Sequence, residues 1–174
     1  MKAIVTTIER ITESVGFLTA LVIIPLVLAT CYEVFSRYLF NAPTTWAFEL
    51  GYILTGTHFL LGGAITLLRG SHIRIDLLYA NFSPRTKAAV DMTLYLFLLL
   101  PFLVMLCDSL GDYALRSFET GERTGQSSWN PPIWPFRAVI TFGFAMLALQ
   151  VTAEILKCAA ILRGRPITTD RAEG

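Results

Sequence analysis

Four long apolar stretches, separated by short polar segments, dominate the pattern of this 174-residue chain. Residues 14–32, 50–68, 92–107 and 138–153 contain no Asp, Glu, Lys or Arg. The first two stretches reach 19 residues, and the others approach that length if a terminal charged side chain extends to the membrane surface. About 20 apolar helical residues cross the hydrocarbon core of a bilayer. The pattern therefore predicts four membrane-spanning helices, at approximately 15–37, 46–68, 88–112 and 135–158.

Composition supports the membrane prediction and narrows the function classes. The chain is 54% hydrophobic and 16% charged, whereas soluble domains are about 25% charged. A soluble helical bundle is the alternative, but so short a chain could not cover four helices that are apolar all round. The formal net charge of +1 gives no field that would attract nucleic acid or an acidic substrate. We expect an all-α integral membrane protein with one membrane domain over 1–174, lipids as partners and no nucleic acid.

The distribution of basic residues predicts the orientation in the membrane. Lys and Arg are enriched in short cytoplasmic segments near the helix ends. They gather before the first span, between the second and third, and after the fourth: Lys2, Arg10, Arg69, Arg74, Arg85, Lys87, Lys157, Arg163, Arg165 and Arg171. Both termini are therefore predicted to be cytoplasmic, with a periplasmic loop at approximately 117–134 and a cytoplasmic tail at approximately 163–174.

Prolines predict where the helices break or bend. Pro43 disfavours helix at the residue before it, and Thr44 or Thr45 can then cap the second span. Pro25 and Pro101 lie inside predicted spans, where a proline removes a helix hydrogen bond and kinks the chain.

A short amphipathic helix is predicted between the second and third spans, at approximately 74–82. The apolar side chains of Ile75, Leu78, Tyr79 and Phe82 recur at helical spacing, so they can lie in the inner membrane interface. A plain loop is the alternative, because the segment is short for a freestanding helix. Ser83 follows as a suitable cap for the third span.

Three charged residues lie near the outer ends of the first two spans. Glu33 and Arg37 are four residues apart, so they share a helix face and can pair. Glu49 lies just inside the second span, where a helix N-terminus favours a carboxylate, and it can complete a cluster across the hairpin. We expect a structural staple or a contact with another membrane subunit. A proton or ion relay is the alternative, but the depth does not suit a coupling site at the membrane midplane.

The sequence predicts no catalytic, substrate-binding, metal or cofactor site. His58 and His72 are 14 residues apart, about 21 Å along a straight helix, so they cannot ligate one haem together. Cys31, Cys107 and Cys158 are far apart and lack metal-site spacing, which indicates apolar packing residues. We therefore expect a protein that is not an enzyme.

Three segments resemble the small membrane subunit of tripartite ATP-independent periplasmic (TRAP) transporters, the DctQ type. They are "EVFSRYLFNAPTTWAFEL", "FLLGGAITLLRGSHIRIDLL" and "WNPPIWPFRAVITFGFAMLALQ". The resemblance extends over roughly 9–162 and rests most strongly on Arg37, Tyr38, Pro43, Trp46, Glu49, Leu50, Arg69, His72, Ile73 and Asp76, with weaker support from Pro132, Trp134 and Pro135. One departure is Thr57, where such subunits often have Trp.

The resemblance implies a multi-pass protein of the bacterial inner membrane that works in an assembly. A periplasmic binding protein captures an organic acid and delivers it to a large membrane subunit, which imports it with a sodium gradient. The small subunit braces the large one, with or without direct contact to the binding protein, and holds neither the main substrate site nor the sodium sites. Structural or interface roles are expected for Glu33, Arg37, Tyr38, Pro43, Trp46, Glu49, Arg69, His72, Arg74, Asp76 and Trp134.

Two other functions remain open at this point. One is a self-sufficient four-helix transporter that works as a homo-oligomer, and the other is a membrane anchor subunit of a redox enzyme. The transported substrate cannot be named from this chain, because the binding protein and the large subunit would select it.

Overall fold

A computed structural model describes residues 1–70 and 82–165 of the protein, and these are helical apart from short connections. The elements are α1 (Lys2–Leu21), α2 (Ile23–Phe40), α3 (Trp46–Leu68), α5 (Pro84–Leu94), the π-helix η1 (Tyr95–Leu99), α6 (Leu100–Glu119) and α7 (Trp134–Leu162). The elements α5, η1 and α6 follow one another without a break and form a single long helix.

Four helices are long and apolar enough to cross a membrane: Lys2–Phe40, Trp46–Leu68, Pro84–Glu119 and Trp134–Leu162. They confirm the predicted all-α membrane protein with four spans. The first helix has 39 residues, and at about 1.5 Å per residue it is roughly 58 Å long, well beyond the hydrocarbon thickness. The predicted span limits and the cytoplasmic position of both termini stay predictions. The predicted interfacial helix at 74–82 and the tail beyond 165 lie almost entirely outside the described residues.

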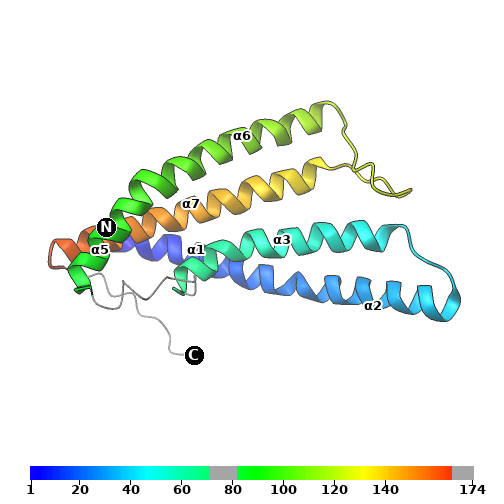
Figure 1. The fold of residues 1–174 in the computed structure, drawn as a ribbon, viewed down its shortest axis with the longest axis horizontal. Helices are drawn as coiled ribbons and strands as arrows, with labels where there is room; N and C mark the ends of the chain where they lie inside the picture. The colour runs from blue at the N-terminus through cyan, green and yellow to red at the C-terminus, as the bar shows by residue number, and fades with distance from the viewer. Residues whose placement is uncertain (71–81, 166–174) are drawn as a thin grey trace.

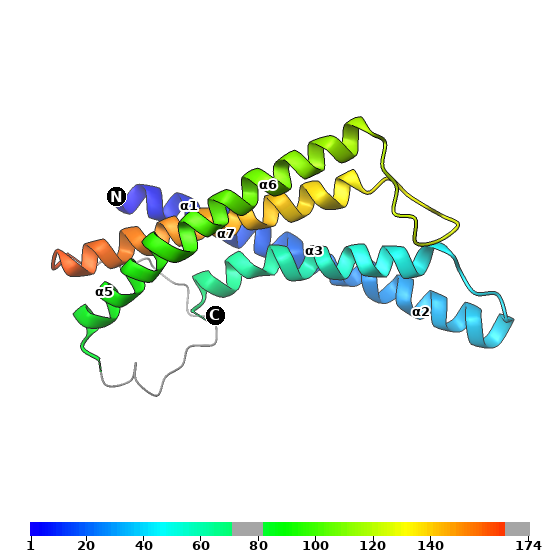
Figure 2. The same cartoon turned by 45° about the horizontal axis from the view of Figure 1, so that its top comes forward.

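The helices form an open layer rather than a closed bundle. Figures 1 and 2 show α2, α3, α7 and α6 side by side in this order, with α2 and α6 at the two edges. Each helix packs on the next, and α1 packs against both α3 and α7. The two edge helices do not pack against each other in the part of the chain that the structure describes. No further helix of the described residues therefore covers either edge of the layer.

The apolar core lies where α1, α3 and α6 meet α7. One cluster joins Val5 and Ile8 of α1 to Ala153 of α7. A second cluster, made of buried Leu67, Leu103 and Val151, joins α3 and α6 to α7. The central helix α7 is thus the element around which the others pack.

A glycine permits a close approach between the backbones of α3 and α7. A Cβ atom at Gly143 would lie 3.3 Å from both the carbonyl carbon and the carbonyl oxygen of Leu60. Ordinary Cβ contacts are longer, so a side chain at this position would push the two helices apart.

Both intramembrane prolines coincide with an interruption of the helix, as predicted. The break between α1 and α2 is at Val22, one turn before Pro25, and the Val22 N–H donates to Thr19 O over 3.1 Å. The π-helix Tyr95–Leu99 lies directly before Pro101. In each case the proline lacks the N–H that an α-helix would need at that position.

The observed helix caps agree only in part with those predicted from the sequence. Ser83 caps α5 as predicted, because its Oγ accepts from the Thr86 N–H over 3.2 Å. The capping prediction for α3 is wrong, since Thr45 occupies the cap position without a side-chain bond and Thr44 bonds elsewhere. At the end of α2, Asn41 has a left-handed conformation with φ 52°, which Asn tolerates better than most residues.

Candidate functional site

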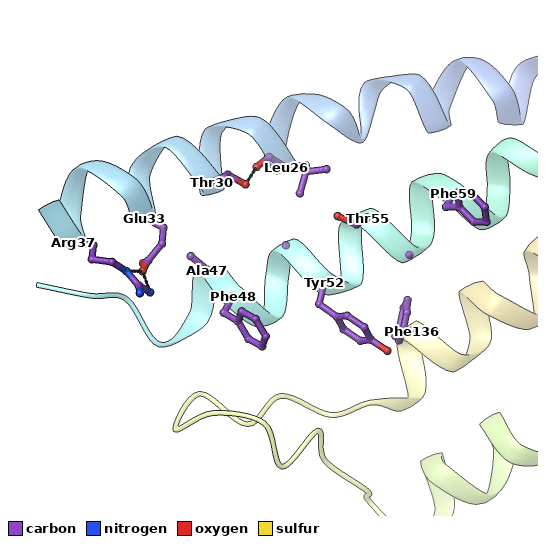
Figure 3. Close-up of a pocket in the computed structure, with 12 residues that line it drawn as sticks. Leu26, Thr30, Glu33, Arg37, Ala47, Phe48, Tyr52, Thr55, Phe59 and Phe136 are labelled. Carbon is purple, nitrogen blue, oxygen red and sulfur yellow. Dashed lines mark hydrogen bonds and ion pairs between the residues drawn. The ribbon is translucent and has the colours of Figure 1, made fainter.

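Glu33 connects the C-terminal end of α2 to the turn that precedes α3. Its Oε1 accepts from Arg37 Nε over 2.9 Å and from Arg37 Nη2 over 2.5 Å, so the pair expected from the sequence spacing is present. Its Oε2 accepts from the Thr44 N–H over 2.9 Å and also from the Thr44 hydroxyl. The Glu33 side chain is 14% exposed, whereas that of Arg37 is 54% exposed. Arg37 and Thr44 therefore both hold the carboxylate, and Arg37 is the more exposed of the paired side chains. Figure 3 shows the Glu33–Arg37 pair.

Glu49 does not join this pair, so the predicted three-residue cluster is wrong. Its Oε2 instead accepts from the Thr124 hydroxyl over 2.6 Å, in the connection between α6 and α7. The physical reason is the helical register. Ala47 lies beside Glu33 and Arg37 on the face toward α2, and a side chain two residues later is turned by about 200°.

The Glu49 carboxylate is nevertheless buried, and one of its two oxygens accepts no hydrogen bond from the described residues. The residue is 2% exposed, and its Oε1 has no hydrogen-bond partner among the described residues. It lines a cavity of about 50 Å³ together with Tyr52, Thr124 and Gln126. The residue lies in the first turn of α3.

A second polar cluster, which the sequence did not reveal, joins α6, the loop between α6 and α7, and α7. The Arg137 guanidinium donates to both carboxylate oxygens of Glu122, with Nη2 to Oε1 at 2.7 Å. The same Nη2 donates to the Tyr113 hydroxyl over 2.6 Å, and the guanidinium carbon lies 3.6 Å from the centre of the Tyr113 ring. Arg137 is buried at 8% exposure. In the sequence it was only a scattered basic residue, because its partners are 15 and 24 residues away.

The hydrogen bonds from Arg137 hold the pKa of Glu122 below its ordinary value of 4.5. A lowered folded-state pKa stabilises the fold above the ordinary value, and this contribution is lost as the pH falls through the folded-state pKa. We expect the thermal midpoint of the wild type to fall more steeply between about pH 5 and pH 3 than that of Glu122→Gln. Thermal unfolding in detergent at several pH values measures the difference, and parallel curves for the two proteins would contradict it.

A third cluster, which we call the Glu9–Lys157 cluster, joins the N-terminal half of α1 to the C-terminal half of α7. Lys157 Nζ lies 2.8 Å from Glu9 Oε1 and 2.5 Å from Glu154 Oε1. Gln150 donates to Glu154 over 3.0 Å and accepts from the Thr12 hydroxyl over 3.0 Å. Two acids share one cation among side chains that are mostly buried. The contact between the two helices could not be predicted from spacing, because Glu9 and Lys157 are 148 residues apart.

The remaining predicted positions are more scattered. Trp46 stacks on Tyr32 with 5.7 Å between ring centres, and Trp134 packs edge-on against Phe118 at 5.2 Å. Tyr38 is 79% exposed. Pro43 lies in the turn before α3, and Arg69 follows the last residue of that helix. His72, Arg74 and Asp76 lie outside the described residues.

A groove between α2 and α3, which we call the α2–α3 groove, lies beside Glu33 and Arg37. It has a volume of about 720 Å³. Its lining is mostly apolar, with small residues on α3 and polar side chains at the outer end: Leu26, Thr30, Glu33, Arg37, Ala47, Phe48, Gly51, Tyr52, Thr55, Gly56, Phe59 and Phe136. Figure 3 shows the Glu33–Arg37 pair at one end of the groove and the ring of Phe59 at the other.

One family model matches the chain, that of the DctQ component of tripartite ATP-independent periplasmic transporters, over residues 26–160. The match includes most of α2, all of α3, α5 and α6, and the loop between α6 and α7. The chain belongs to the DctQ family. It is therefore a component of a TRAP transporter in the inner membrane and is not an enzyme. A comparison with individually curated proteins gives no match.

Membership of the DctQ family places the chain in a system of three proteins, with a large membrane partner and a substrate-binding protein. The matched region contains the Glu33 and Arg137 clusters and the α2–α3 groove. By contrast, α1, with Glu9 and Thr12, precedes the matched region. The cluster of Glu9, Glu154 and Lys157 thus joins α1, which lies outside the family match, to α7.

Proposed function

We propose that this chain braces the large, sodium-coupled subunit of a TRAP transporter that imports an organic acid from the periplasm. In this role it widens the fixed scaffold against which the transport domain of the large subunit moves. The large subunit packs in the α2–α3 groove. Substrate and sodium are bound by the large subunit rather than by this chain.

The observation that carries the proposal is the open edge formed by α2. Ala29 is the one buried residue that α2 contributes within the described chain, and Val27, Phe35 and Leu39 are 51%, 59% and 70% exposed. A transporter that worked alone would need an enclosed path between helices. An edge helix that packs mainly on one neighbour instead suits a subunit completed by another protein.

The surface chemistry of the groove suits a helix of a membrane partner. Association of helices in a bilayer relies on close packing, which small residues such as Ala47 and Gly51 permit. A Cβ atom at Gly51 would meet nothing within 4 Å, so the space above this residue is open. The aromatic rings of Phe48 and Phe59 border the space and are 66% and 81% exposed. They offer apolar contact area to the partner.

The polar clusters support a static role for the chain. Glu33, Arg137 and Lys157 each connect neighbouring elements of this chain, at the outer or inner part of the layer. Charge that serves an ion pathway would instead line a path near the middle of the membrane. The ionic contacts of the described residues thus agree with a chain that acts as a rigid scaffold.

The proposal is tested by co-purification with the large subunit of the same system. Gly51→Trp fills the groove, so we expect it to reduce recovery of the large subunit at least about tenfold. The thermal midpoint of the isolated variant should stay close to that of the wild type, because the position is open. Met105→Trp on α6 is the matched control, since Met105 is 71% exposed at the opposite edge.

Two outcomes would contradict the proposal. Full recovery of the large subunit with Gly51→Trp, together with loss in Met105→Trp, would move the docking surface to α6. Uptake of an organic acid by vesicles that contain this chain alone would instead support a self-sufficient transporter and end the bracing role.

A further inference from the structure

A basic pocket lies between the start of α1 and the end of α7. It has a volume of about 230 Å³ and is lined by Met1, Lys2, Ala160, Arg163 and Arg165. The two helix ends lie at the same end of the layer, as Figures 1 and 2 show. Among the described residues, three cationic side chains and no acidic one therefore border a single concave surface.

These three cations differ from the other clustered cations of the protein. Arg37, Arg137 and Lys157 each contact a carboxylate. In the described residues, by contrast, Lys2, Arg163 and Arg165 form no ion pair, and Arg163 only donates to the sulfur of Met1 over 3.8 Å. Like charges gathered without an anion repel one another, so a bound anion would stabilise the arrangement.

The start of α1 adds to the positive potential of the pocket. Its first turn contains no acidic residue, and its N-cap makes no side-chain hydrogen bond. The free N–H groups and the positive end of the helix thus lie beside Lys2. Helix N-termini with such free groups favour phosphate.

We propose that this pocket binds the phosphodiester headgroup of an anionic phospholipid. A lipid is favoured over free phosphate because Met1, which lines the pocket, is 50% exposed, and Ile4 in the first turn of α1 is 57% exposed. The pocket also lies at the ends of two membrane-spanning helices, on the side that the basic residues predict to be cytoplasmic. Basic pockets between helices on that side recognise anionic headgroups.

Such a lipid would bridge two helices that are far apart in the sequence. Lys2 belongs to α1, whereas Arg163 and Arg165 follow α7. The bridge would reinforce the nearby contact between Glu9 and Lys157. This site is separate from the α2–α3 groove, so it does not depend on how the large subunit docks.

Lipid titration of the purified full chain in detergent tests the proposal. We expect phosphatidylglycerol, but not phosphatidylcholine, to raise the thermal midpoint and to remain bound in native mass spectrometry. The triple variant Lys2→Gln, Arg163→Gln, Arg165→Gln should bind phosphatidylglycerol with an affinity reduced at least about tenfold. The matched control replaces three basic residues that do not line the pocket with Gln: Arg10, Arg69 and Arg85.

The outcomes separate the possible sources of the phosphate. Weaker binding in the pocket variant, with unchanged binding in the control, supports the lipid site. Equal losses in both variants would show a general effect of charge and overturn the site. An increase in thermal midpoint with inorganic phosphate alone, and none with phosphatidylglycerol, would also overturn the lipid assignment.

Discussion

Lys157→Met is expected to destabilise the isolated protein by about 3–5 kcal/mol, the usual cost of removing one partner from a buried ion pair. The lysine lies between Glu9 and Glu154, and the three side chains are 13%, 7% and 18% exposed. Without the ammonium group, two mostly buried carboxylates would remain without a cation. Unfolding of the purified chain in detergent, followed by thermal midpoint and by denaturant, measures the loss.

Two further variants distinguish the charge effect from a packing effect. Lys157→Arg keeps the positive charge and should retain most of the stability. The triple change Glu9→Gln, Glu154→Gln, Lys157→Met removes all three charges together, so it should be more stable than Lys157→Met alone. The prediction fails if Lys157→Met unfolds at the same midpoint as the wild type.

Gly143→Leu should destabilise the chain by about 1–3 kcal/mol, the usual cost of overpacking. Even a Cβ atom at this position would lie 3.3 Å from backbone atoms of Leu60, and backbone cannot move aside as a side chain does. The substitution therefore separates α3 from α7, the contact that holds the two halves of the layer together. Thermal unfolding of the isolated subunit measures the effect.

Gly62→Leu is the matched control, because a Cβ atom at Gly62 on α3 meets nothing within 4 Å. It adds the same side chain to a glycine of a membrane-spanning helix without that close approach. A similar loss of stability in both variants would show that helix propensity or lipid contact, rather than the α3–α7 approach, sets the effect.

The parts of the structure that depend on local sequence could be predicted. Four charge-free stretches gave the four spanning helices, and Pro25 and Pro101 marked the interruptions. Glu33 and Arg37 could be paired because four residues bring two side chains to one helix face. In each case the deciding contacts lie within a few residues along the chain.

The parts that depend on tertiary packing could not be predicted. Glu33 also binds Thr44, and this contact depends on how the turn folds back after α2. Glu49 bonds to Thr124, which is 75 residues away, so no spacing rule could identify its partner. The order of α2, α3, α7 and α6 in the layer was equally hidden, because each apolar helix could pack on any other.

The interruption at Val22 has a consequence for membranes of different thickness. The first part of the long first helix, α1, contacts α7 through the ion pair of Glu9 with Lys157. The second part, α2, contacts the turn before α3 through the hydrogen bond that Glu33 accepts from Thr44. A mismatch between helix length and bilayer can be absorbed by tilting or kinking. Since the helix hydrogen bonding is interrupted at Val22, we expect a change in bilayer thickness to alter the angle between α1 and α2 more than the contact between α2 and the turn before α3.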